Sequence, residues 1–140
     1  MILIADSGST KIDWCVLNGK EKVAQVFTCG MNAMMLTEEE MFETIKKELV
    51  PQLNGMEITE VYYYGAGCVA DKKYIIEQLL KKVFHNNTTI SVESDIMAAC
   101  HALCGKEEGL VCILGTGSNS CLYDGQKMTL QTSPLGFILG

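Results

Sequence analysis

The sequence predicts an α/β protein whose mixed sheet combines a three-stranded meander with alternating helices and strands. Three observations lead to this prediction. The N-terminal region holds three apolar or alternating segments separated by turn residues. Segments with helical spacing then alternate with short strand-like runs. Near residue 110 the meander pattern begins again, which indicates the start of a second domain of the same kind.

The predicted meander comprises residues 2–6, 12–18 and 22–28. The first strand is an apolar run that ends at Asp6, and a turn rich in glycine and hydroxyl side chains follows it. The second strand closes with Asn18-Gly19, a dipeptide typical of two-residue hairpins. Three consecutive antiparallel strands are therefore expected.

The first helix is predicted to begin at Thr37, because Thr37 and Glu40 have the spacing of a capping box. Apolar residues repeat at helical spacing as far as Val50, and Pro51 is expected to end or bend the helix. Residues 58–65 are predicted to form a buried strand that runs into a glycine turn.

The second helix is predicted to start at a cap formed by Asp71. Residues 88–93 form the next expected strand. Ser94 or Asp95 then caps a third helix, and Gly105 suits the position just after its end. Because strands and helices alternate here, we expect the helices to cover both faces of a mixed sheet.

The order β-β-β-α-β-α-β-α is typical of the ribonuclease-H-like layout, so residues 1–105 are predicted to form one such domain. Residues 106–140 are predicted to be the opening meander of a second domain, with strands at 110–114, 119–123 and 127–132. The chain stops before that meander becomes a complete domain. We therefore expect the segment to pair across a homodimer, to pack with a continuation or to be poorly ordered.

Composition excludes several classes of protein. The net charge of −6 comes without a basic face, so a nucleic-acid partner is not expected. Apolar runs are no longer than strands, so no membrane helix is expected. The N-terminus lacks the basic region of a signal peptide, and a cytoplasmic location is predicted. The seven cysteines form no C-x-x-C pair and are interpreted as reduced, mostly buried small hydrophobes.

Two turns of the sequence resemble each other. Residues 4–9 and 114–118 each join a buried strand to an alternating strand, and Gly8 aligns with Gly117. Such a turn can aim several backbone N–H groups at one point, because glycine has no Cβ to block the approach. Either turn alone could be an ordinary hairpin. The repetition favours a pair of phosphate cradles that hold one polyphosphate.

These segments resemble a known group of proteins. The run Asp6-Ser7-Gly8-Ser9-Thr10-Lys11 resembles the first phosphate motif of the actin/hexokinase/heat-shock-70 superfamily, and Gly115-Thr116-Gly117-Ser118-Asn119 resembles the second. Within it the chain is similar to the BadF/BadG/BcrA/BcrD ATPase group, which includes the N-acetylglucosamine kinases. Residues 94–99 resemble the segment of the catalytic aspartate, residues 30–32 the Gly-x-Asn that contacts the sugar, and residues 133–140 the lead-in to a Gly-Asp-Glu-Gly-Ser motif. Family members continue beyond this point, where they bind adenosine.

The resemblance implies a kinase that transfers a phosphoryl group from ATP to a hydroxyl of N-acetylglucosamine or a related amino sugar. Asp95 would be the general base and contact the sugar. Asp6 would hold Mg²⁺, through water. The sugar would also meet Asn32, Ser118 and Asn119. The implied contacts to the ATP phosphates are Ser7, Gly8, Ser9, Thr10, Lys11, Gly115, Thr116, Gly117 and Ser118.

Other interpretations stay open at the level of sequence. Asp95 could serve only as a helix cap, Asn32 could be a polar loop residue, and Lys11 could be solvated. Trp14 and the run Tyr62-Tyr63-Tyr64 are expected to pack in the core or on a sheet face. The alternative function is that of an ATP-driven activator of a 2-hydroxyacyl-CoA dehydratase, whose relatives carry an iron–sulfur cluster at a subunit interface. We expect the 140-residue chain to be inactive by itself.

Overall fold

A computed structural model describes residues 1–8, 10–31, 36–66, 68, 70–85, 87–114 and 118–132. The chain forms two compact units, Met1–Glu93 and Ser94–Gly140, and each is described by itself. Some predictions fall outside the described residues: those on Ser9, Asn32, Gly115, Thr116, Gly117 and the segment 133–140.

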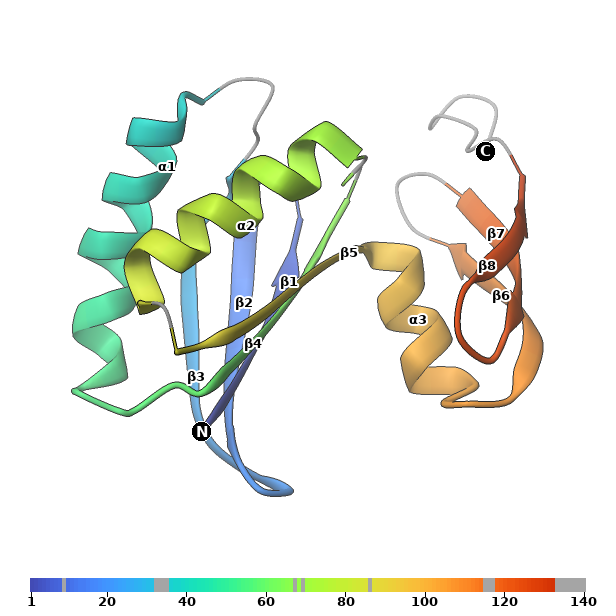
Figure 1. Ribbon diagram of the computed structural model, residues 1–140, viewed down its shortest axis with the longest axis horizontal. Coiled ribbons are helices and arrows are strands. Elements are labelled where there is room, and N and C mark those ends of the chain that lie inside the picture. Colours follow the sequence, from blue (N-terminus) through green and yellow to red (C-terminus); the bar gives the residue numbers. More distant parts are fainter. Residues whose placement is uncertain are drawn as a thin grey trace. The chain divides into compact units, whose positions relative to one another are not determined.

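The sheet of the first unit has five strands in the order β3-β2-β1-β4-β5 (Figure 1). β1 pairs antiparallel with β2 and parallel with β4, and β2 pairs antiparallel with β3. The predicted meander and the mixed sheet are therefore confirmed. The strands are β1 (Ile2–Ser7), β2 (Lys11–Asn18), β3 (Glu21–Cys29), β4 (Glu60–Gly65) and β5 (Thr89–Ser94).

The first helical segment begins with the predicted capping box. Thr37 accepts a hydrogen bond from the Glu40 N–H, and the Glu40 side chain accepts one from the Thr37 N–H. α1 (Glu38–Thr44) continues into a π-helical turn (Ile45–Leu49) and a 3₁₀ turn (Val50–Leu53). Pro51 lies in the first positions of that last turn, where the N–H that proline lacks is not needed. The chain therefore tightens its helix at Pro51 and ends it at Leu53.

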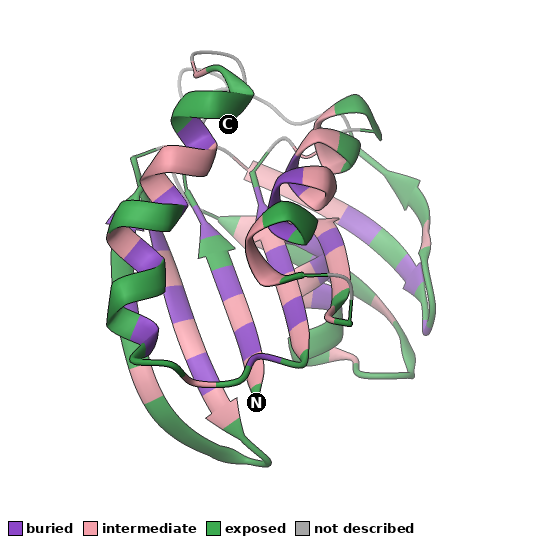
Figure 2. Cartoon of the chain, turned by 60° about the vertical axis from the view of Figure 1, so that its left-hand side comes forward, coloured by how far each residue is buried: buried purple, intermediate pink, exposed green. Residues whose placement is uncertain are grey.

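The second helix, α2 (Ala70–Phe84), packs with α1 against the same face of the sheet (Figure 2). Alternate side chains of the central strands, among them Leu3 and Trp14, are fully buried beneath the two helices. The prediction that helices cover both faces is thus not met inside this unit. Asp71 lies within the first turn of α2 and is not its cap.

The second unit is a three-stranded antiparallel sheet with one helix on one face. Its elements are α3 (Asp95–Leu103), β6 (Glu108–Leu114), β7 (Ser118–Asp124) and β8 (Met128–Gln131). Ile96 and Cys100 of α3 are buried together with Val111 and Cys121 of the sheet. Gly105 ends the helix with a φ of 60°, the left-handed conformation predicted for this position.

The division between the units differs from the expected domain boundary, which followed Gly105. α3 packs against β6 and β7, so the second compact unit already begins at Ser94. Local periodicity predicted the helix but not the sheet that it joins. The assignment of residues 1–105 and 106–140 to two domains stays a prediction.

The face of the second sheet that α3 does not cover is apolar. Cross-strand register places Leu110 opposite Leu122, and Leu122 opposite Leu130. With Leu114, these side chains are between 44% and 87% exposed. One face of this sheet therefore presents leucines that no described residue of the second unit covers.

The cysteines are more exposed than the sequence predicted. All seven are free thiols, but only Cys100 and Cys121 are buried, while Cys29 and Cys112 are exposed. Both exposed cysteines occupy outward positions of alternating strands, a feature that cysteine count and spacing do not reveal. Among the described residues, no helix is long and apolar enough to cross a membrane.

Candidate functional site

Asp6 is exposed near the end of β1, on the sheet face that the helices do not cover. The β1–β2 register places it opposite Asp13. The Gln25 amide donates to both Asp13 carboxylate oxygens, at 2.9 and 2.8 Å, whereas no described residue forms a hydrogen bond or ion pair with the Asp6 carboxylate. Asp6 is therefore free to face a ligand.

Polar groups of Ser7 and Gly8 already have hydrogen-bond partners within the protein. The Tyr63 hydroxyl donates to Ser7 Oγ at 2.6 Å, and both residues are buried. The Gly8 N–H donates to the Lys11 carbonyl oxygen at 3.0 Å. Because these groups already have partners, Ser7 and Gly8 contribute to the shape of the turn more than they donate hydrogen bonds to a ligand. Thr10 is the exposed hydroxyl residue among the described part of the turn.

The ends of two other strands meet this turn. The Gly30 N–H donates to the Thr10 carbonyl oxygen at 2.9 Å, so the chain beyond β3 lies beside the turn on its way to Asn32. The Ala66 N–H donates to the Ser7 carbonyl oxygen at 3.2 Å, which brings the end of β4 to the same edge. In open α/β sheets, ligands bind at the carboxyl ends of parallel strands, as β1 and β4 are here.

Lys11 begins β2 on the exposed face of the sheet. Its ammonium lies 5.5 Å from the centroid of the Phe27 ring, a distance suited to a cation–π contact. Both interpretations of Lys11, phosphate contact or solvated side chain, remain compatible with this position.

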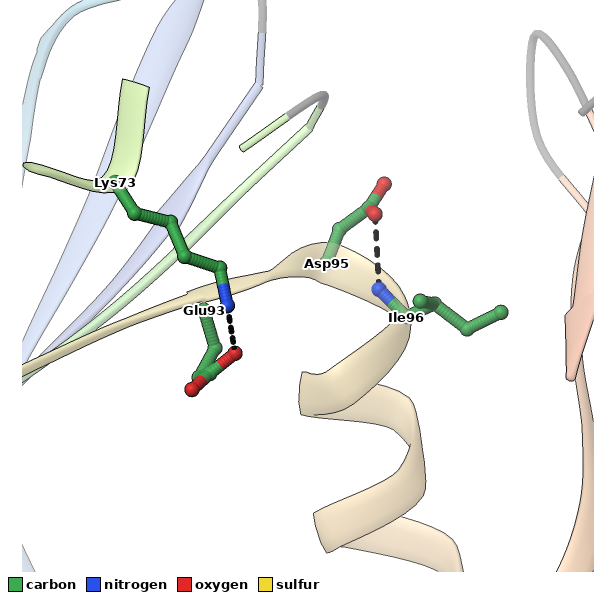
Figure 3. A network of polar contacts seen from close by, with 4 residues as sticks. All are labelled: Lys73, Glu93, Asp95 and Ile96. Carbon is green, nitrogen blue, oxygen red and sulfur yellow. Dashed lines mark hydrogen bonds and ion pairs between the residues drawn. The ribbon is translucent and has the colours of Figure 1, made fainter. Parts of the chain in front are cut away.

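Asp95 is the first residue of α3 and directly follows β5 (Figure 3). Its carboxylate accepts a hydrogen bond of 2.8 Å from the Ile96 N–H, while Ser94, at the cap position, makes no side-chain cap bond. The hydrogen bond from the Ile96 N–H holds the Asp95 side chain at the N-terminus of α3. Glu93, two residues before Asp95, forms an ion pair with Lys73 of α2 and fixes the end of β5 (Figure 3).

Asp95 and Ser118, the first residue of β7, lie at the same end of the second unit. Cys100 Sγ lies 3.5 Å from Cys121 Sγ, and the Tyr123 hydroxyl donates to the Gly105 carbonyl oxygen at 3.1 Å. The chain therefore runs in the same direction along α3 and along β7, which places the first residue of α3 near the start of β7. Ser118 and Asn119 are half-buried there, and Asn119 Oδ1 accepts a hydrogen bond from Gln131.

Sequence reasoning missed Tyr63, which was expected only to pack. The predicted buried strand agrees with the burial of Tyr63, but three consecutive tyrosines do not show which of them faces the core, and the hydroxyl partner depends on the parallel β1–β4 register. None of the described residues that line two surface grooves, of about 350 and 380 Å³, is a predicted site residue. One groove lies at α1 and α2, and the described lining of the other is residues 56–59, 83–85, 87 and 88.

Comparison with known proteins places this fold. No protein-family model and no curated protein matches the chain. Solved structures of two distantly related proteins share the fold of this chain. The ROK hexokinase from Thermus thermophilus shares its fold, with a TM-score of 0.62 at 19% identity over 91% of this chain and 47% of that one. So does MreB5 of Spiroplasma citri bound to ADP, with a TM-score of 0.65 at 11% identity over 96% of this chain and 51% of that one.

One solved structure is similar in sequence as well as in fold. It is described as the putative N-acetylglucosamine kinase from Porphyromonas gingivalis, with 42% identity and a TM-score of 0.91. The similarity covers 100% of this chain and 50% of that protein. The chain thus spans about half the length of the solved structures that it matches.

Proposed function

We propose that this chain is the part of an ATP-dependent sugar kinase that binds the phosphates of ATP and activates the acceptor hydroxyl. The acceptor is N-acetylglucosamine or a related amino sugar. The observation that carries the proposal is the 42% identity, over the entire chain, to the Porphyromonas protein. The hexokinase and MreB5 are too distant in sequence to support more than the fold.

In the proposed reaction Asp95 is the general base. Its carboxylate accepts the proton of the sugar hydroxyl while that oxygen bonds to the γ-phosphorus, and the bond from the γ-phosphorus to the bridging oxygen of ADP breaks. A carboxylate suffices, since phosphoryl transfer passes through a loose transition state that depends on orientation more than on a strong base. The bond from the Ile96 N–H supports this role by fixing the orientation of the Asp95 side chain.

The residues of the first unit fit a magnesium nucleotide. Mg²⁺ prefers hard oxygen ligands and keeps several waters, and an exposed Asp6 beside Asp13 offers suitable carboxylates. Bound Mg²⁺ would neutralise charge on the phosphates of ATP. Asp6 would hold it through water. We keep the phosphate contacts proposed for Ser9, Thr10 and Lys11 and for the second turn, with Ser7 and Gly8 supporting the first turn.

Three finer assignments belong to the same proposal: membership of the BadF/BadG/BcrA/BcrD ATPase group, a cytoplasmic location, and a homodimer that covers exposed leucines of the second unit. The activator alternative has less support. The solved protein that is 42% identical to this chain is described as a putative N-acetylglucosamine kinase, and not as an activator.

The test uses a chimera that continues this chain with the part of the Porphyromonas protein that it does not cover. We expect ADP release that depends on an amino sugar, with a sugar phosphate detected by mass spectrometry. Asp95→Asn should lower turnover by about a hundredfold or more, in the range typical of a lost general base. Asp71→Asn, a carboxylate in the first turn of α2, is the matched control and should leave turnover unchanged. Normal turnover in Asp95→Asn would contradict the proposed base.

A further inference from the structure

A small group of buried polar side chains lies directly beneath the first turn. Ser7 and Thr28 are buried hydroxyl residues in a core that is otherwise apolar apart from Trp14 and Tyr63. The Tyr63 hydroxyl donates to Ser7 Oγ at 2.6 Å, and Trp14 Nε1 donates to Thr28 Oγ1 at 2.9 Å. The two aromatic rings pack at 6.1 Å between centroids.

Ser7 is held on two sides by the end of β4. Tyr63 binds its side chain, and the Ala66 N–H binds its carbonyl oxygen at 3.2 Å. The next residue, Gly8, begins the turn and closes it through its bond to the Lys11 carbonyl oxygen. A shift of Ser7 would therefore displace the first residue of the turn.

The position of the Tyr63 ring depends on Gly65. A Cβ added at Gly65 would lie 2.9 Å from Tyr63 Cε1 and 2.8 Å from Cys68 Sγ, both too close for real contacts. The absence of a side chain at Gly65 thus leaves the space in which the Tyr63 ring reaches Ser7. Strand β4 supplies both the hydroxyl and the room for it.

We propose that Tyr63 is a positioning residue that holds Ser7 and Gly8, the start of the first phosphate-binding turn, in place through its hydrogen bond to Ser7. A turn that is already in shape pays less conformational entropy when a ligand binds. The identity of the ligand, the phosphates of ATP, rests on the proposed function. The proposed effect of Tyr63 on the turn does not depend on that function.

The test removes the Tyr63 hydroxyl and compares the effect with that of removing the other buried hydrogen bond. Tyr63→Phe keeps the ring and its contacts with Trp14 but leaves Ser7 without its donor. Thr28→Val removes the acceptor of the other buried bond, so it costs the core a comparable hydrogen bond without touching Ser7. Both variants are first compared with the wild type for cooperative unfolding.

Amide hydrogen exchange of the chain gives the readout that needs no ATP. In Tyr63→Phe the Gly8 and Ala66 amides should exchange about tenfold faster, because local opening becomes easier. In Thr28→Val they should exchange as in the wild type. In a Ser7→Ala background, Tyr63→Phe should have no further effect on the Gly8 amide. Equal exchange in Tyr63→Phe and wild type, or equal acceleration in Thr28→Val, would overturn the proposal.

Kinetics of the chimera separate this proposal from the proposed function. Tyr63→Phe should raise the KM for ATP about tenfold and change kcat much less, since a preformed turn acts mainly on binding. If kcat fell and KM were unchanged, positioning of the phosphate-binding turn would be wrong. If no variant, wild type included, used ATP, the sugar-kinase proposal would fail, and amide exchange alone would decide whether Tyr63 holds the turn.

Discussion

Replacing Tyr63 by Phe should change how the stability of the chain depends on alkaline pH. Burial raises the pKa of the Tyr63 hydroxyl from 10.0 to about 12, although the hydrogen bond to Ser7 acts in the opposite direction. The folded state therefore holds this proton more tightly than the unfolded state. The associated stability is fully present below about pH 10 and is lost as the pH rises towards 12.

The magnitude follows from the two pKa values. At about pH 11.5 the wild type should have lost about 2 kcal/mol of unfolding free energy through Tyr63, at about 1.4 kcal/mol per pKa unit. At neutral pH, Tyr63→Phe should be less stable than the wild type by about 1–2 kcal/mol, because Ser7 Oγ stays buried without its donor. The difference between the two proteins should therefore shrink to about zero near pH 11.5.

Urea unfolding followed by Trp14 fluorescence measures this directly, since Trp14 is the only tryptophan and packs against Tyr63. Lysines and the other tyrosines also titrate in this range, but they are common to both proteins and cancel in the difference. An unchanged gap between wild type and variant from pH 8 to 11.5 would refute the assignment of a buried, proton-retaining hydroxyl to Tyr63.

Three further predictions follow from local geometry. Iodoacetamide should modify exposed Cys112 within minutes and should not modify Cys100 until the protein unfolds. Cys100 is protected because burial raises the pKa of its thiol to about 12. Peptide mapping that finds equal rates of modification at both cysteines would contradict the burial of Cys100. Thr37→Ala should destabilise the chain by about 1 kcal/mol in urea unfolding, because it removes the α1 cap, and an unchanged midpoint would count against the capping box. Gly65→Ala should cost about 1–3 kcal/mol by calorimetry through its contact with the Tyr63 ring, whereas wild-type stability would show that the space is not needed.

Most helices and strands were predictable from the sequence, because the signals that mark them depend only on residues close together in the chain. The capping box at Thr37 and the Asn18-Gly19 hairpin depend only on neighbouring residues, and both are present. The burial of Trp14 followed from strict alternation along one strand. The pairing of α3 with the second sheet, in contrast, depends on contacts between segments, which periodicity does not contain.

The candidate site was predictable by residue type but not in detail. The sequence indicated Asp6 and Asp95 at the ends of strands; in the structure Asp6 lies near the end of β1, and Asp95 directly follows β5. It did not indicate that the Gly8 N–H would be used inside the turn. Nor did it reveal the hydrogen bond between Ser7 and Tyr63, because that bond depends on the register between β1 and β4, which lie far apart in the sequence.

Amide chemical shifts of the ¹⁵N-labelled chain during a titration with Mg·ATP would test the central claim most directly, namely that two glycine-containing turns bind one polyphosphate. We expect the largest shifts at residues 7–11 and 115–119, and smaller ones at Asp95 and Ile96. Shifts concentrated instead at the groove that residues 56–59, 83–85, 87 and 88 line, or no shifts at millimolar Mg·ATP, would contradict the claim.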